Sequence, residues 1–588
     1  MLPPLVKMKG MSMSQRWLPI TLAVLATMSL SPRIYAAVTT TPLVLYTDLA
    51  SGPNSGGENG KGVYLSVFGK NFGAGAPGTA KVTIGGVEVD NYRYVGPAKG
   101  RADIQQITVQ IGAIGNPTPG AAKAVQVVVN GVGSNTDRTF TVNPGRMLFV
   151  DNVQGNDGTA VPGDIAHPYK HVQGTSLATA AYGAMVPGDI IVMRGTGTAW
   201  TELGYDTYFV KFAGKNASAP TGAASTGPFT LMGYPNEDVF IDIVGNVGKK
   251  GAISGVDTTS YDGGRWITIA DLRIESGGNA GVIAQQIAGD HWRIVNNDLS
   301  AASATNTAKA AGINGNGPSA FWVGNHIHNI AGGVAQENHG IYIDGDGTYE
   351  IAYNTIDHVS GGSGMQVYVN GGNGSDYADN VHFHHNVVHD ISKHGINIAD
   401  NMRNGLAIWN NVVYNTAIAS LRFNTNTLHG AKIYNNTFYN AITTASDYDG
   451  AITNDWNFPS DALDMRNNLI MPAPNMPYTG GSVGFCEGVG CASVGTIAKN
   501  LWTAGGTTFG FDSNPVTGNA LFVDATNADF HLKPGSAAID SGLAAVSALV
   551  TDDFDVVVSR PPATAFDIGA YEYQAGYVYD RIFIDGFQ

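Results

Sequence analysis

The chain has 588 residues, 43% of them hydrophobic and 13% charged, and its formal net charge at pH 7 is −15. A chain of this length exceeds a single ordinary core, so we expect more than one domain. Its acidic surface would repel nucleic acid and anionic membranes, and we predict neither as a partner.

Residues 1–36 carry basic residues, then the apolar run Trp17–Leu30, then small residues suited to cleavage. These features predict a secretory signal peptide and a secreted protein, extracellular or on the cell surface. The segment holds four basic and no acidic residues, so the remaining 28 basic and 47 acidic residues give a net charge of −19. No later stretch approaches 18 consecutive apolar residues, so no membrane-spanning helix is expected. In an oxidising compartment Cys486 and Cys491 are expected to form a local disulfide, with a metal pair as the alternative.

A short sequence motif, here called the Asn phrase, recurs in the centre of the chain, from about Trp292 to Trp502. Each copy reads apolar, any residue, a small or polar residue, Asn, any residue, apolar, and successive asparagines are 25–32 residues apart. Such a repeat of short alternating apolar runs indicates a solenoid, and we predict a parallel β-helix with coils about 4.8 Å apart. Each Asn is expected in a left-handed turn, with its amide bonded to the Asn of the next coil. The asparagines are Asn297, Asn325, Asn354, Asn386, Asn411, Asn436, Asn468 and Asn500.

Residues 37–145 show a different sequence pattern, in which strand-like runs such as Val63–Phe68 are joined by Gly, Pro and Asn turns. Short strands at this spacing predict a small β-sandwich. The segments Gly69–Gly73, Val82–Val87 and Phe140–Val142 resemble an immunoglobulin-like IPT/TIG domain. The resemblance implies a spacer or binding platform, so no chemistry is placed there.

The rest of the chain divides into a β-helix over residues 146–520, a C-terminal segment over 521–575 and a short tail over 576–588. Both ends of a solenoid need cover for the open core and the unpaired edge strand, and we expect the C-terminal segment to be a cap. The chain resembles secreted right-handed β-helix proteins of the pectate-lyase-like superfamily. The segments that carry this resemblance are Phe149–Asn152, Pro187–Val192, Phe229–Pro235, Phe530–Gly542 and Asp567–Glu572.

A second run precedes the Asn phrase in each central coil, and its alternation turns one set of side chains outward. Tyr342, Gln366, Asn397 and Arg422 are expected to form one outward column. Asp344, Tyr368, Ala399 and Asn424 are expected beside it, with His339, Lys393 and His394 in the turns that lead into the strands. A polar, partly aromatic strip suits a sugar chain, so we predict that a monomer binds an anionic polysaccharide here. The predicted substrate-binding residues are His339, Tyr342, Gln366, Tyr368, Asn397 and Asn424.

The resemblance implies cleavage of a uronic-acid polysaccharide by β-elimination. This reaction needs a cation for the uronate carboxylate, a base for the α-proton and a proton for the leaving oxygen. We predict Lys393, His394 and Arg422 as the catalytic residues. Arg422 would bind the carboxylate, and Lys393 or His394 would act as base.

Two other functions stay open. Hydrolases of the same superfamily use paired carboxylates, and Asp344, Asp346 and Asp400 are candidate acids. The Asp-Asp pair and the Gly-His-Gly segment of the polygalacturonases are absent from this sequence. The third possibility is a non-catalytic carbohydrate-binding or adhesin-like surface protein, because a fold does not fix a function.

Metal ligands have two candidate positions. Asp344 and Asp346 lie in a Gly-rich turn without a completed loop motif, and Ca²⁺ is the cofactor that they would bind. His382 and His384 are the other candidates, for a transition metal, but the sequence names no third ligand for them. We interpret His382, His384 and His385 as a solvated face or as turn residues.

Overall fold

The structure is a computed structural model, and it describes residues 40–114, 121–219, 227–245, 251–255, 264–277, 281–285, 289–302, 309–333, 337–369, 377–444, 450–480, 494–503, 511–560 and 565–575. These residues belong to one compact unit that runs from Ala36 to Gln588. The predicted signal peptide, the two cysteines and the C-terminal tail lie outside the described residues. No helix within the described ranges is long and apolar enough to cross a membrane.

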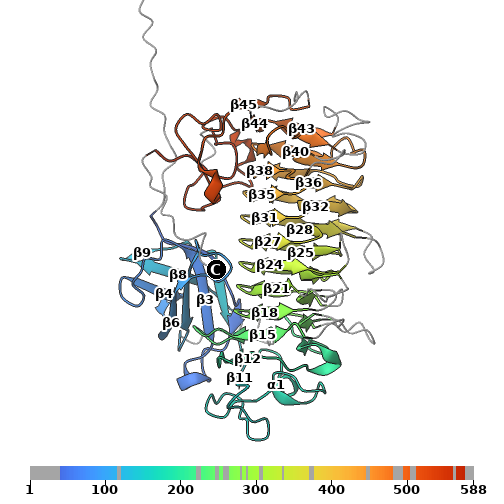
Figure 1. Cartoon of the computed structure of the whole chain (residues 1–588). Coiled ribbons are helices and arrows are strands. Elements are labelled where there is room, and N and C mark those ends of the chain that lie inside the picture. The colour runs from blue at the N-terminus through green and yellow to red at the C-terminus, as the bar shows by residue number, and fades with distance from the viewer. Residues whose placement is uncertain are drawn as a thin grey trace, which may run out of the picture. The chain divides into compact units, whose positions relative to one another are not determined.

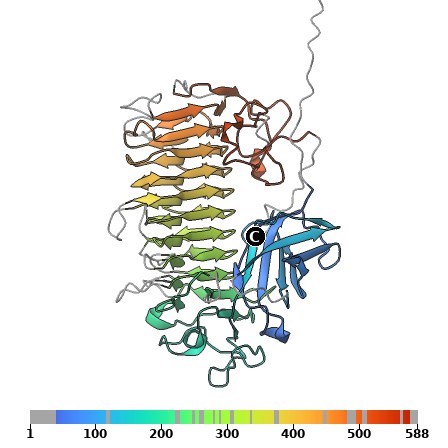
Figure 2. The same cartoon turned by 180° about the vertical axis from the view of Figure 1, so that it is seen from behind.

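The N-terminal part is a small β-sandwich, as predicted (Figures 1 and 2). One antiparallel sheet has the order β1-β3-β7-β6, and the other has the order β2-β10-β8-β4-β5 with β9 paired to β8. Inward side chains such as Val67, Val82 and Val109 are fully buried between the sheets. The strands are β1 (Leu43–Thr47), β2 (Ser51–Gly52), β3 (Tyr64–Lys70), β4 (Ala80–Ile84), β5 (Val87–Glu88), β6 (Asn91–Pro97), β7 (Gln105–Gln110), β8 (Ala122–Val129), β9 (Val132–Gly133) and β10 (Thr139–Val142), with the 3₁₀ turn η1 (Glu58–Gly60).

The rest is a parallel β-helix with three long sheets, and its middle coils contribute one strand to each of them. Sheet I consists of β11 (Met147–Val150), β12 (Ile190–Met193), β14 (Phe229–Gly233), β17 (Ile267–Ala270), β20 (Arg293–Val295), β23 (Ala320–Val323), β26 (Tyr349–Ala352), β30 (Val381–His384), β34 (Ala407–Trp409), β37 (Ala431–Tyr434), β40 (Leu463–Arg466) and β43 (Gly495–Ala498). Sheet II consists of β15 (Phe240–Ile243), β18 (Arg273–Ser276), β21 (Asp298–Ala302), β24 (His326–Ala331), β27 (Thr355–Val359), β31 (Val387–Ile391), β35 (Val412–Thr416), β38 (Thr437–Ala441), β41 (Leu469–Pro472), β44 (Leu501–Thr503) and β45 (Val516–Gly518). Sheet III consists of β13 (Val210–Lys211), β16 (Ile253–Ser254), β19 (Ile283–Gln285), β22 (Ala311–Gly315), β25 (Asn338–Ile343), β28 (Gly362–Tyr368), β32 (His394–Asp400), β36 (Ala419–Phe423), β39 (Ile452–Asn454) and β42 (Thr479–Gly480).

Short elements complete the chain. The helix α1 (Ala180–Ala184) and the 3₁₀ turn η2 (Tyr205–Thr207) lie in the early coils. A two-stranded pair, β29 (Ala378–Asp379) and β33 (Met402–Asn404), follows two strands of sheet III. The C-terminal segment holds β46 (Phe522–Asp524), η4 (Ala525–Asn527), β47 (Asp529–Leu532) and η5 (Ala544–Val546).

The predicted asparagine ladder is confirmed at the turn between sheets I and II. Asn354 Nδ2 donates to Asn386 Oδ1 at 3.0 Å, and the same oxygen accepts the backbone N–H of Asn354 at 3.0 Å. The pattern repeats through Asn411 and ends at Asp512, whose Oδ2 accepts the side-chain amide of Asn500 at 3.0 Å. Every ladder side chain from Asn297 to Asn500 is fully buried, and its amide satisfies backbone groups that the turn would leave unpaired.

The prediction that each ladder Asn adopts a left-handed backbone is wrong, because the residue before it does so. His385, Asn410 and Asn435 have φ values of 53°, 50° and 52°, and Tyr353 has 57°. The left-handed residue turns the chain so that the following Asn points into the stack. Its own side chain remains outside the stack, at the corner between sheets I and II.

The β-sandwich is attached to this corner. The backbone N–H of Lys99 donates to Asn296 Oδ1 at 2.9 Å, and Arg101 Nη1 donates to the carbonyl of His385 at 2.8 Å. Arg101 is 5% exposed, and its guanidinium also pairs with Asp103 at 2.7 Å. The sandwich therefore packs against the coils themselves.

The C-terminal segment lies along the flank of the last coils (Figure 1), whereas the sequence placed it over the open end. Asn435 Nδ2 donates to the carbonyl of Asp567 at 3.0 Å, and Asn467 Nδ2 donates to that of Leu543 at 2.9 Å. Outward apolar side chains explain the difference, since residues such as Trp409 pack against this segment.

Candidate functional site

The outward face of sheet III carries the predicted column. Pairing of β25, β28, β32 and β36 places Tyr342 beside Gln366, Gln366 beside Asn397 and Asn397 beside Arg422. The predicted inward set, Ile341, Met365, Ile396 and Leu421, is fully buried. One detail of the neighbouring column is wrong, because the register shifts after Val367 and Tyr368 pairs with Asp400 instead of Ala399.

Strands β25, β28 and β32 each carry a glycine near their start, where the neighbouring sheet leaves no room for a side chain. A Cβ on Gly364 would lie 2.5 Å from Val388 Cγ1, and a Cβ on Gly395 would lie 2.3 Å from Val413 Cγ1. The glycines thus bring sheet III against sheet II, and the strands can then project their polar residues outward.

The centre of the column is an amide pair. Asn397 Nδ2 donates to Gln366 Oε1 at 2.7 Å, and both side chains are largely buried by their neighbours. At one end Tyr342 is half-buried, and its ring stacks on His339 with centroids 5.3 Å apart. The face therefore presents an aromatic pair followed by amides that are held in position by each other.

The two histidines lie in strands β25 and β32, where the sequence had placed them in turns. His339 and His394 are 4% and 7% exposed and flank Ser363. Ser363 donates its backbone N–H to His339 Nδ1 at 3.3 Å, and its Oγ lies 3.5 Å from His394 Nδ1. Burial lowers the pKa of His339 to about 3 and holds the pKa of His394 well below its usual value, so both rings are neutral at pH 7.

Lys393, His394 and Arg422 influence one another electrostatically. Burial lowers the pKa of the half-buried Lys393, and the positive charge of Arg422 lowers it further. The charges of Arg422 and Lys393 also oppose protonation of His394. Lys393 directly precedes His394, and Arg422 lies on the next coil, three residues beyond Ala419, the strand partner of His394.

Two residues at the other end of the column were missed by the sequence analysis. Arg422 donates from Nη2 to the carboxylate of Asp455, so its guanidinium is held in an ion pair. Trp456 follows directly, is 54% exposed, and donates from Nε1 to the predicted binding residue Asn424 at 2.5 Å. The sequence contained a signal for both residues, because Asp455 and Trp456 directly follow β39, the next strand of sheet III after β36.

The predicted acids lie at the same edge of sheet III. Burial raises the pKa of Asp400, whose Oδ1 accepts the backbone N–H of Asn401 at 2.9 Å. Asp344 is half-buried and Asp346 is exposed. Within the described ranges neither belongs to a set of three metal-ligating side chains, and Ca²⁺ binding there remains a prediction.

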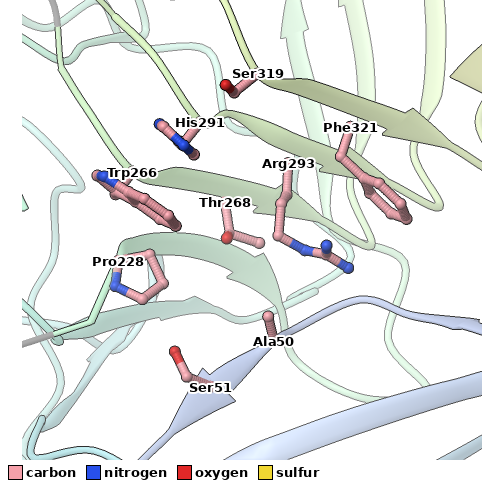
Figure 3. Close-up of a pocket in the computed structure, with 9 residues that line it drawn as sticks. All are labelled: Ala50, Ser51, Pro228, Trp266, Thr268, His291, Arg293, Ser319 and Phe321. Carbon is pink, nitrogen blue, oxygen red and sulfur yellow. The ribbon is translucent and has the colours of Figure 1, made fainter. Parts of the chain in front are cut away.

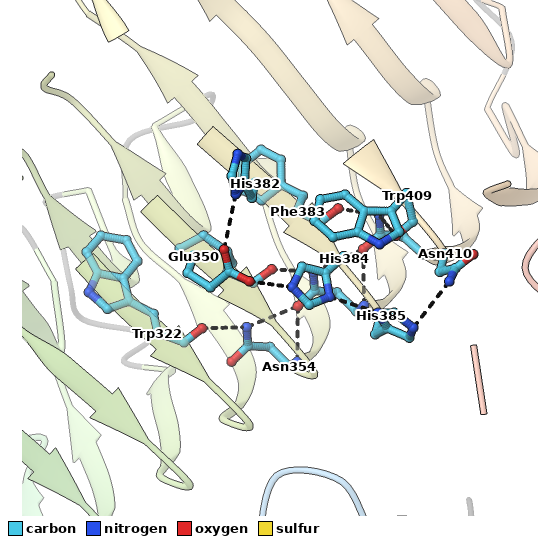
Figure 4. A network of polar contacts seen from close by, with 12 residues as sticks. Trp322, Glu350, Asn354, His382, Phe383, His384, His385, Trp409 and Asn410 are labelled. Atoms are coloured by element: carbon cyan, nitrogen blue, oxygen red, sulfur yellow. Dashed lines mark hydrogen bonds and ion pairs between the residues drawn. The ribbon is translucent and has the colours of Figure 1, made fainter. Parts of the chain in front are cut away.

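The histidines at 382–385 form part of sheet I and of its corner (Figure 4). Glu350 accepts from His384 Nε2 at 2.5 Å and from His382 Nδ1 at 3.2 Å, and His384 stacks on Trp409 with centroids 4.3 Å apart. The interpretation as a solvated face is wrong for His384 and His385, which are 8% and 3% exposed, whereas the alternative of a turn residue holds for His385, which follows β30 with φ 53°. These residues support the junction with the flanking segments.

A cavity of about 190 Å³ lies between strand β2 and sheet I (Figure 3). Trp266 stacks on His291 there, with centroids 3.9 Å apart, and Arg293 donates to the carbonyl of Thr47 at 2.6 Å. The cavity is smaller than the roughly 300–1,000 Å³ of most ligand pockets, and its one cation is bound to the sandwich. We therefore assign it to the domain junction.

Comparison with known proteins supports the fold. The model of the right-handed beta helix region matches residues 255–438, which identifies the solenoid as a right-handed parallel β-helix. No curated protein matches the chain.

Three solved structures are similar in arrangement. Pectate lyase Pel9A is 13% identical, with a TM-score of 0.40 over 74% of this chain and 97% of that one. The mannuronan C-5 epimerase A-module from Azotobacter vinelandii is 9% identical, with a TM-score of 0.31 over 64% and 89% of the two chains. The family 28 exopolygalacturonase from Yersinia enterocolitica is 12% identical, with a TM-score of 0.30 over 82% and 89%.

Proposed function

We propose that the chain is a secreted carbohydrate-active protein that binds an anionic polysaccharide along the outward face of sheet III and cleaves it by β-elimination. The observation that supports this proposal is a face on which Lys393, His394 and Arg422 lie on two adjacent coils, between the aromatic pair at Tyr342 and the exposed Trp456.

The face has the dimensions and the chemistry for a sugar chain. From Tyr342 to Thr453 it crosses four coil steps, which is about 19 Å at roughly 4.8 Å for each step. Aromatic rings at the ends can pack on the apolar faces of sugar rings. Between them, the Gln366 side chain is held by Asn397 at 2.7 Å, and its amide N–H groups would donate to hydroxyl groups.

The basic residues match the needs of elimination. The guanidinium of Arg422 would bind the uronate carboxylate and stabilise the charge that develops when the α-proton leaves. Lys393, with its lowered pKa, would accept that proton in its neutral form. The C–H electron pair forms the new C=C bond, the bond to the leaving oxygen breaks, and that oxygen takes a proton from water or a nearby acid such as Asp400.

The ion pair of Arg422 with Asp455 favours binding without chemistry as the second candidate. A substrate carboxylate would have to compete with Asp455 for the guanidinium, which reduces the stabilisation left for a transition state. In that case the face would hold a polysaccharide through Trp456, Tyr342 and the amides alone.

Purified protein incubated with a panel of uronate-containing and neutral polysaccharides distinguishes these functions. Elimination raises both the ultraviolet absorbance of unsaturated uronate and the number of reducing ends, hydrolysis raises reducing ends alone, and a binder raises neither. We expect Arg422→Ala to lower turnover by about 10²–10³, by analogy with the loss of one oxyanion donor. Lys393→Ala should abolish turnover but keep polysaccharide affinity, whereas Trp456→Ala should weaken affinity. Activity that survives both Lys393→Ala and His394→Ala would refute the assignment of the base.

A further inference from the structure

A second cluster of polar side chains lies on a different face, the outward side of sheet II. Strands β21, β24 and β27 are stacked there on consecutive coils (Figure 1). Asp298 pairs in register with His326, and His328 pairs with Asp357. The four side chains therefore occupy two adjacent outward columns, and none of them belongs to the face of sheet III.

The ligand atoms of three of these residues converge. One atom from each of Asp298, His326 and His328 lies within 4.8 Å of the other two, and within the described ranges no other three His, Cys, Asp or Glu side chains come this close. His328 Nε2 lies 2.9 Å from Asp298 Oδ1, and His326 Nδ1 lies 3.7 Å from Asp298 Oδ2. The two imidazoles are nearly parallel, with centroids 4.3 Å apart. Each of the three side chains is about one-fifth exposed, so an ion can enter and keep water ligands.

The far sides of both imidazoles are also engaged. Asp357 Oδ2 lies 2.8 Å from His326 Nε2, which leaves Nδ1 to face Asp298. The Asn329 amide lies 2.9 Å from His328 Nδ1, and turning that amide presents its oxygen to an Nδ1–H when Nε2 binds a metal. A carboxylate or amide behind a ligating imidazole orients the ring and raises its basicity, as in known metal sites.

Neighbouring charges favour a cation. Asp357 adds a second carboxylate, and Glu275 lies one coil earlier beside Ser300. Two cations interact with Asp298 from outside the cluster, and both have other partners: Arg273 pairs with Asp238 at 2.6 Å, and Lys99 Nζ donates to the carbonyl of Asp271 at 3.0 Å.

A carboxylate and two histidines in the same register also occur on sheet I, so these residue types alone do not produce a converging set of ligand atoms. Glu350 pairs in register with His382, and His384 follows two residues later, as in Asp298, His326 and His328. There, however, the three ligand atoms do not come within 4.8 Å of one another as they do in the sheet II cluster, and the ring of His384 is stacked on Trp409. This set serves as the matched control.

We propose that Asp298, His326 and His328 bind one divalent transition-metal ion, with Asp357 positioning His326. Two imidazoles and one carboxylate with open positions suit Zn²⁺ and the other late first-row metals better than Ca²⁺ or Mg²⁺, which take oxygen ligands. The site is separate from the proposed polysaccharide-binding face and does not depend on the function proposed for it.

Metal titration of the tag-free full-length protein tests the proposal. After treatment with a chelator, wild-type protein should bind one Zn²⁺ per chain, and bound Co²⁺ should show d–d absorption without thiolate charge-transfer bands. Asp298→Asn and His328→Gln should lower Zn²⁺ affinity at least 100-fold, and Asp357→Asn by about 10–100-fold, the usual range for an outer partner. The control His382→Gln should keep wild-type affinity.

Wild-type protein supplies a readout that does not depend on any variant folding. Bound Zn²⁺ should protect His326 and His328 from diethylpyrocarbonate, measured by mass spectrometry, while His167, whose side chain is 58% exposed, should stay reactive. Failure to bind near one equivalent of Zn²⁺, equal affinity of the Asp298→Asn variant, or protection confined to other histidines would overturn the proposal.

Discussion

Replacing one ladder asparagine should destabilise the β-helix far more than its size suggests. In Asn386→Ala, the backbone N–H and the side-chain amide of Asn354 both lose their acceptor, Asn386 Oδ1. The carbonyl of Ile351 also loses the amide that donates to it at 2.9 Å. All of these groups lie in the interior of the turn, where water cannot replace the lost partner.

The magnitude follows from the number of donors left without a partner. Each buried donor without an acceptor costs about 1–3 kcal/mol, so the two donors of Asn354 predict a loss of about 2–6 kcal/mol. The matched control is Thr355→Ala on the same coil, which removes one hydrogen bond, from Thr355 Oγ1 to the carbonyl of Gly100 at 2.9 Å. That loss should cost about 0.5–1.5 kcal/mol.

Denaturant unfolding followed by circular dichroism measures the difference. The transition of Asn386→Ala should move to lower denaturant and can split into two phases, since a solenoid is held together by contacts between neighbouring coils. A midpoint shift for Asn386→Ala no larger than that of Thr355→Ala would refute the view that the ladder stabilises the stack.

Three further perturbations test other parts of the structure. His531 lies between two aspartates that raise its pKa to about 9, so its contribution of about 3 kcal/mol should be present below about pH 6.5 and lost as the pH rises through 9. His531→Gln should flatten this part of the stability profile, and an unchanged slope would contradict it. Gly364→Ala should lower the melting temperature through a cost of about 1–3 kcal/mol from overpacking, whereas Gly245→Ala, with nothing within 4 Å of the added carbon, should not. Arg101→Ala leaves Asp103 without its guanidinium and should speed proteolysis between the sandwich and the coils, and wild-type proteolysis rates would argue against this anchor.

The ladder shows how much a repeat determines before any coordinates exist. Because every coil must offer the same hydrogen bonds to its neighbours, the spacing of Asn354, Asn386 and Asn411 fixed the stacking and the inward direction of apolar residues. The same register placed Tyr342 beside Gln366. The sequence did not reveal that the left-handed residue precedes the Asn, since both positions accept asparagine.

The same register also predicts that the residues of the proposed metal site lie on neighbouring coils. Asp298 and His326 each follow a ladder Asn directly, so counting forward from the ladder places them in register on neighbouring coils. The register alone does not show whether the ligand atoms of the three side chains converge. Glu350, His382 and His384 share the same strand register, yet their three ligand atoms do not converge as those of the sheet II cluster do, and His384 packs on Trp409.

The sequence by itself thus determined the period, the buried face of each strand and the neighbours along each column, because these follow from local alternation and a repeated hydrogen-bond pattern. Only the tertiary structure decided which distant segments and side chains contact the outward columns. The pairing of Arg422 with Asp455, the attachment of Arg101 to His385 and the course of the C-terminal segment along the flank join residues 33 to 284 positions apart. Such contacts depend on loop lengths and on outward surfaces that need cover, and neither is encoded in a local pattern.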